Sequence, residues 1–337
     1  MNNEPSLEAP KPASHRFAHL AISFIFIAAI AYGTLFYGQR VIDMVQARMF
    51  TPSGQVAAVT ERLNLTPHGY NIFYASDPQV EDKNTFNTNC QSTERTAAIL
   101  GCYWKRNIHL FDVQNKELDG TLEVTAAHEM LHAAYERLNW IERERVDKLV
   151  EEEFQRNRGN AALKQIMQYY AQSEPGAESN ELHSIIGTTV ADISPELESY
   201  YSQYFADRAT IVALNTKYNA VFGELNKQAD ELEAKIKSEG PAIQAELANY
   251  EADRQQLELD IQTFNARAQS GGFTTQSAFN VARNALTTRL SSMNARQQAV
   301  NARVASYNDL VAQLNALAIR VDQLNASING ASAASGL

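Results

Sequence analysis

The sequence lacks the short motifs of several common enzyme classes. It contains no Gly-Lys-Ser/Thr phosphate loop, no Gly-x-Ser-x-Gly elbow and no Gly-x-Gly-x-x-Gly fingerprint. Nucleotide binding and serine hydrolysis therefore have no support.

Positive charge is also in short supply. The 337 residues include 29 lysines and arginines against 39 aspartates and glutamates, which leaves a net charge of -10. Because an acidic surface repels a phosphate backbone, and no basic stripe offsets that charge, we expect no nucleic-acid partner. The hydrophobic content of 45% is ordinary for a globular protein and excludes a disordered chain.

Residues 17–37 depart from globular composition, because they carry no Asp, Glu, Lys or Arg. The run is about as long as a helix that crosses a bilayer, so we predict a transmembrane helix there. The alternative is a cleavable signal with Ala29-Ile30-Ala31 as its cleavage site. The run exceeds the usual signal core of about 7–15 residues, which favours a retained anchor.

The basic residues that flank this run do not decide its orientation. Lys11 and Arg16 precede it, and Arg40 and Arg48 follow it, so the charge rule is close to a tie. The position of the run near the N-terminus, like an export signal, favours a cytoplasmic N-terminus with the rest of the chain on the extracytoplasmic side.

Only two cysteines are present, Cys90 and Cys102. A disulfide between them would close a loop of about a dozen residues, which the chain-entropy model values at about 3 kcal/mol. The alternative is two buried thiols. We predict the disulfide, which implies an oxidising compartment and agrees with the expected orientation.

Turn signals and hydrophobic patterns divide the rest of the chain. We expect a disordered tail at 1–16, a juxtamembrane linker at 38–55 and a folded domain at 56–205.

In this domain, β-favouring residues predict strands at 70–75, 97–104 and 107–113, the last two as a hairpin. From Leu122 the period becomes helical, and further helices are predicted at 141–157, 161–172 and 178–190, with another opening at Ser194-Pro195.

The composition changes again after Asp207. Apolar residues step by three and four over 206–329, and the loop at 270–273 turns the chain back on itself. We predict an antiparallel coiled-coil hairpin, kinked or broken at Pro241, followed by a flexible tail at 330–337. We expect such a hairpin to bind a protein partner or to self-associate.

One segment carries a catalytic pattern, His128-Glu129-Met130-Leu131-His132. Its two imidazoles lie four residues apart on a predicted helix, about 40° apart around the axis, so both can reach one metal ion. Neutral imidazoles bind Zn²⁺, which lowers the pKa of a bound water towards about 7, and Glu129 would take the proton as that water attacks a carbonyl. The alternative is a pair of packed or surface histidines.

This segment resembles the zincin metallopeptidases. Metzincins continue with a glycine and a third histidine within about six residues, whereas this chain continues as a helix with neither. It is more similar to gluzincins, whose third ligand is a glutamate on a later helix, and Asn180-Glu181 matches that pattern. The resemblance covers about residues 95–205 and implies that Glu181 is the third zinc ligand.

His183 is the rival of Glu181 on the same predicted helix. The two residues are about 200° apart around it, so only one of them can face His128 and His132. We choose Glu181, because its carboxylate also reduces the net charge of the site. The candidates for a transition-state or supporting role are His183, Tyr135, Tyr200 and Tyr201. The alternative for each of these four is an ordinary core residue.

The predicted fold is α+β, with a zincin-like catalytic domain between an N-terminal transmembrane helix and a C-terminal coiled-coil hairpin. The predicted function is hydrolysis of peptide bonds in protein or peptide substrates by a membrane-anchored zinc metallopeptidase. The first alternative is a structural or scaffolding envelope protein that acts through its coiled coil, with a non-catalytic metal site. The second is a zinc amidohydrolase that acts on cell-wall peptides.

Overall fold

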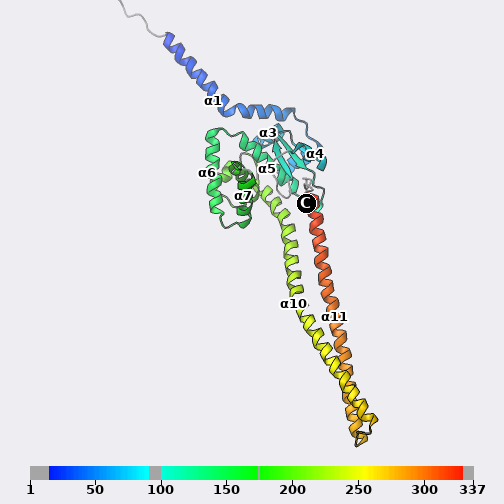
Figure 1. Cartoon of the computed structure of the whole chain (residues 1–337). Coiled ribbons are helices and arrows are strands. Elements are labelled where there is room, and N and C mark those ends of the chain that lie inside the picture. The colour runs from blue at the N-terminus through cyan, green and yellow to red at the C-terminus, as the bar shows by residue number, and fades with distance from the viewer. Residues whose placement is uncertain (1–14, 91–99, 174, 329–337) are drawn as a thin grey trace, which may run out of the picture. The chain divides into compact units, whose positions relative to one another are not determined.

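The computed structural model describes residues 15–90, 100–173 and 175–328 (Figure 1). These residues form long helices and one small mixed sheet, which agrees with the α+β class. They divide into two compact units. The first extends to Asn219 and also takes in Ser327 and Ile328, and the second comprises residues 220–326.

Helix α1 (His15–Met49) contains the segment in which we predicted a transmembrane helix. That prediction is wrong, because no helix of the described residues is long and apolar enough to cross a membrane. The expected membrane anchor, and the placement of the chain on two sides of a membrane, are wrong with it.

The C-terminal part of α1 packs against the first unit. It contacts helix α3 (Pro67–Ala75), and its Asp43 is buried and lies 2.9 Å from the guanidinium of Arg137. Helix α2 (Gly54–Leu63) follows α1 and presents Val56 and Leu63 to the core. The predicted tail at 1–16 lies outside the described residues, except that residues 15 and 16 open α1.

The strand predicted at 70–75 is wrong, since these residues belong to α3. The Thr66 side chain accepts a hydrogen bond from the Gly69 amide and caps the helix, and Pro67 occupies its first position. The aromatic and branched residues that suggested a strand instead form the buried face of the helix, as Ile72 and Phe73 show.

The sheet has the strand order β1-β3-β2. Strand β1 (Gln79–Glu81) pairs parallel to β3 (Asn107–Phe111), and β2 (Gly101–Trp104) pairs antiparallel to β3. The predicted hairpin is confirmed, although its strands are shorter than the predicted 97–104 and 107–113: residues 100, 112 and 113 are not in strands, and 97–99 lie outside the described residues. Helix α4 (Lys83–Asn89) ends at Cys90, which is bonded to Cys102 of β2 as predicted.

The predicted helices of the first unit are confirmed. After the short turn η1 (Lys116–Leu118), they are α5 (Thr121–Glu136), α6 (Trp140–Arg156), α7 (Ala161–Ser173), α8 (Glu178–Thr189) and α9 (Pro195–Tyr201). Helix α5 lies at the centre and contacts α8, both hairpin strands, α2 and α3. Its approach to α8 requires Gly187, where a Cβ atom would lie 2.4 Å from Leu131 Cδ1.

The second unit is a hairpin of two helices, α10 (Arg208–Gln269) and α11 (Gln276–Ile328), joined by the predicted loop. Helix α10 begins in the first unit and continues through Pro241 as one helix. Ion pairs seven residues apart set the antiparallel register: Arg289 with Asp260, Arg296 with Asp253, and Arg303 with Glu246. The tail predicted at 330–337 lies outside the described residues.

Candidate metal centre

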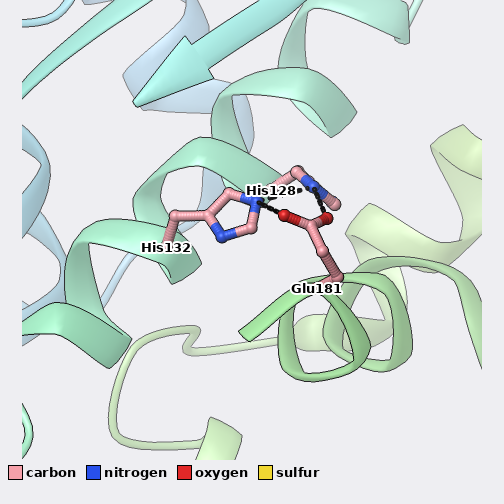
Figure 2. Close-up of side chains that lie close together, drawn as sticks. All are labelled: His128, His132 and Glu181. Atoms are coloured by element: carbon pink, nitrogen blue, oxygen red, sulfur yellow. Dashed lines mark hydrogen bonds and ion pairs between the residues drawn. The ribbon is translucent and has the colours of Figure 1, made fainter. Parts of the chain in front are cut away.

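Two helices bring three predicted ligands together (Figure 2). His128 and His132 project from adjacent turns of α5, and Glu181 comes from the first turn of α8. The Nε2 atoms of the two histidines lie 2.9 Å apart. The Glu181 carboxylate lies 3.5 Å from His132 Nε2 and 3.8 Å from His128 Nε2.

These separations suit a single metal ion. Ligand atoms about 2.0–2.1 Å from a tetrahedral zinc ion are roughly 3.4 Å apart, which lies within the range of the three distances. His132 and Glu181 are buried, whereas His128 is partly exposed. The three residues could hold a metal ion that remains open to the surface on the His128 side.

One carboxylate oxygen of Glu181 supports this assignment. Its Oε2 atom is buried and, among the described residues, has no hydrogen-bond partner. An unpartnered buried oxygen costs free energy, which a bound cation would offset. Burial alone would raise the pKa of Glu181, but His132, His128 and the Tyr170 hydroxyl outweigh it and hold that pKa below its ordinary value.

The second nitrogen of His132 contacts a hydrogen-bond acceptor, since His132 Nδ1 lies 3.0 Å from Asn180 Oδ1. With a metal ion bound, the proton would therefore sit on Nδ1 and the Nε2 lone pair would be free for the metal. Ser184 Oγ lies 3.3 Å from the same Nδ1. Neighbours of this kind orient metal-binding histidines. The sequence pattern did not predict this role for Asn180 or Ser184.

Glu129 follows His128 on α5 and is itself buried. Its side chain runs against Gly101 of β2, where a Cβ atom would lie 2.9 Å from Glu129 Cγ and 3.0 Å from Oε1. Glu129 and His128 line the same cavity. The predicted general base therefore borders the space in which a substrate would meet the metal ligands.

Tyr170 of α7 is a site residue that the sequence analysis missed. It is buried, lines the cavity with His128 and Glu129, and hydrogen-bonds to the Glu181 carboxylate. Nothing in the local sequence distinguishes it from Tyr169 beside it. Its position depends on how α7 packs against α8, which a spacing pattern does not report.

His183 does not join the metal ligands. Its Nε2 lies 2.9 Å from the Tyr200 hydroxyl, and its ring packs against Tyr135 and Tyr201. Complete burial, together with the charges of His132 and His128, lowers the pKa of His183 to about 3, so this imidazole is neutral. The structure thus brings Glu181, and not His183, to the two histidines.

The three tyrosines proposed for supporting roles direct their hydroxyls elsewhere. Tyr135 donates to Asp147 at 2.6 Å, and Tyr201 donates to the His183 carbonyl at 2.7 Å. Tyr200 contacts the His183 ring. Burial raises the pKa of each of these hydroxyls, which form an aromatic cluster around His183.

Comparison with known proteins gives no relative for this chain. No protein-family model matches its sequence, and no curated protein or solved structure matches it. The assignment of the site therefore depends on its own geometry and chemistry.

Proposed function

We propose that this chain is a zinc-dependent peptidase with His128, His132 and Glu181 as metal ligands and Glu129 as general base. The observation that carries the proposal is that these three ligand groups converge and that one of them, His128, lines a cavity whose wall also contains Glu129. Two imidazoles and one carboxylate form the donor set of several catalytic zinc sites. That set leaves one position for water or substrate.

The number of ligands favours catalysis over a purely structural role. Structural zinc sites are almost always closed by four protein ligands, whereas catalytic sites use three. Within the part of the chain that the structure describes, the cluster has three such groups. His128, the most exposed of them, borders the cavity, which would let a substrate approach from that side.

Each residue has a defined task in this proposal. Bound zinc would polarise the substrate carbonyl and lower the pKa of a bound water towards about 7. Glu129 takes the proton of the attacking water and passes it to the departing amine. Asn180 keeps the Nε2 lone pair of His132 available, and Tyr170 holds the Glu181 carboxylate in place.

The test compares the wild type with Glu129→Gln. Glu136→Gln is the matched control, because Glu136 is an exposed glutamate near the end of the same helix. Zinc content is measured first by elemental mass spectrometry, and cleavage of a denatured protein is then followed by peptide mass spectrometry. All three proteins should contain one zinc ion, and Glu129→Gln should lose at least about 10²-fold in rate. Equal rates at equal zinc content would rule out the mechanism.

A further inference from the structure

The cavity beside the metal centre has walls from four helices. It is lined by residues of α5, α7 and α8 and by Asn215 and Tyr218 from the first turns of α10. Its volume is about 220 Å³. A single water needs only about 15 Å³, and pockets that enclose a drug-sized ligand span about 300–1,000 Å³. The space therefore suits one side chain of a longer substrate.

Charge is nearly absent from the lining. Among the described residues around this cavity, Glu129 is the one whose side chain is ordinarily ionised, apart from the titratable His128. A charged substrate side chain would lose its hydration in this cavity. Apart from Glu129, the proposed general base, the described lining offers it no opposite charge in return. The lining therefore disfavours acidic and basic side chains.

Threonines in the lining donate their hydroxyl protons within their own helices. Thr125 donates its hydroxyl proton to the Thr121 carbonyl, Thr188 to the Ser184 carbonyl, and Thr189 to the Ile185 carbonyl. Because each hydroxyl proton is used within its own helix, none is available to a substrate. These threonines therefore offer a substrate acceptor oxygens and no hydroxyl proton.

Apolar side chains complete the cavity. Ile185 is buried in its wall, whereas Ile166 of α7 is 38% exposed. Tyr218 is partly buried, and burial raises the pKa of its hydroxyl. An exposed isoleucine beside a cavity would gain free energy if an apolar group covered it, at about 25 cal/mol per Å².

We propose that this cavity receives an uncharged apolar side chain of a peptide substrate next to the bond that is cleaved. Ile166 and Tyr218 are then specificity-determining residues, the first at the exposed edge and the second at the wall formed by α10. This inference depends on the proposed peptidase function. It goes further by naming the substrate class, peptides with a medium-sized aliphatic or aromatic residue beside the scissile bond.

The first experiment measures preference with a peptide library that varies one position beside the cleaved bond. Wild type should favour Leu, Ile and Phe over Asp and Lys by at least about tenfold in kcat/KM, which is within reach of an apolar pocket. Ile166→Glu should reduce that preference about tenfold and improve cleavage next to Lys. Ile141→Glu is the control, because Ile141 is 46% exposed on α6 and does not line the cavity.

A second variant and a binding measurement keep the test decisive if Ile166→Glu fails to fold. Tyr218→Ala should shift the preference towards larger aromatic residues. Glu129→Gln, which keeps Ile166, Ile185 and Tyr218 in the cavity lining, should bind a fluorescent Leu peptide at least about tenfold more tightly than its Asp counterpart. If wild type cleaves no peptide, the proposed function fails. If it cleaves peptides with a preference that neither Ile166→Glu nor Tyr218→Ala alters, the peptidase stands and this inference is overturned.

Discussion

Asn180 Oδ1 lies 3.0 Å from His132 Nδ1, and this contact aims the other nitrogen of that imidazole at Glu181. Asn180 and Glu181 are neighbours on α8, so one turn of helix supplies both a metal-ligand candidate and the residue that orients its partner. Asn180→Ala should therefore weaken zinc binding about 10- to 100-fold, the usual effect of losing such a contact. Competition with a chelating dye would measure this loss, and Thr189→Ala on the same helix is the control. Unchanged affinity in Asn180→Ala would show that the tautomer is set elsewhere.

The choice between Glu181 and His183 gives a direct test of the ligand set. Glu181→Ala should remove most of the zinc affinity, because the carboxylate lies within 3.5 Å of His132 Nε2. His183→Ala should remove much less, since its imidazole contacts Tyr200. Zinc titration of the two variants, each checked for folding by circular dichroism, distinguishes them. Zinc lost with His183→Ala and retained with Glu181→Ala would reverse the assignment.

Gly101 of the edge strand β2 should be essential for catalysis and not for metal binding. A Cβ atom there would lie 2.5 Å from Thr125 Cγ2 and 2.9 Å from Glu129 Cγ. Gly101→Ala should therefore displace Glu129 and lower kcat by about tenfold or more with zinc content unchanged. Gly159→Ala is a suitable control, because a Cβ atom at Gly159 meets nothing within 4 Å. Full activity in Gly101→Ala would show that the position of the Glu129 side chain does not depend on its contact with Gly101.

The ligand pair was predictable because it depends on the helix period alone. Residues four apart on a helix share a face, so His128 and His132 had to be neighbours once α5 was recognised. Glu181 came from a resemblance and not from spacing, since no local rule relates α8 to α5. The predicted disulfide between Cys90 and Cys102 was equally simple, because two cysteines allow one intramolecular pairing.

The features that were missed depend on packing between distant segments. Tyr170 reaches Glu181 only because α7 packs on α8, and no periodic pattern marks one tyrosine among its neighbours. The segment at 70–75 was misread, because aromatic and branched residues suit a buried helix face as well as a strand. Thr66-Pro67, a cap followed by proline, was the local signal for the helix.

His68 should make the fold sensitive to acid. It lies in a cavity with Arg40, Asp43 and Arg137 and stacks on Tyr204. Burial, with help from Arg40, lowers the pKa of His68 from 6.5 to about 4. The unfolded chain therefore binds a proton between pH 6.5 and 4 that the folded chain does not, and stability falls as the pH drops through this window. Well above pH 6.5 the histidine is neutral in both states and contributes nothing to this dependence.

Urea unfolding of wild type and His68→Gln at pH 7.5, 6 and 5 tests this expectation. The free energy of unfolding should decrease less steeply with falling pH in His68→Gln, because the group that titrates differently in the two states is gone. His109→Gln is the comparison variant, because His109 lies on β3 and its Nδ1 is 3.0 Å from the Glu81 carboxylate. Parallel pH profiles for wild type and His68→Gln would contradict the assignment.

The first turns of α10 belong to the core of the first unit. Ile211 and Val212 are buried, with exposed fractions of 0% and 5%, and Leu214 covers Gly120 at the start of α5. Burial of each such side chain contributes roughly 1.5–3 kcal/mol. Together these contributions are a large part of the free energy of unfolding of a typical domain, ~5–15 kcal/mol. The catalytic unit proposed above therefore needs these turns, although the composition of the chain changes after Asp207.

Two truncations of the full chain separate these turns from the rest of the hairpin. A chain that ends at Asn219 keeps Ile211, Val212 and the cavity residue Tyr218, so it should unfold cooperatively and bind zinc as the full chain does. A chain that ends at Ala206 loses all three, and it should melt at least about 10 °C lower or fail to fold, since 1 kcal/mol shifts Tm by about 2–4 °C at this size. Thermal melts by circular dichroism and zinc content compare them. Equal melting of both chains would show that the core ends before α10, whereas unfolding of both would show that residues 220–326 stabilise the first unit.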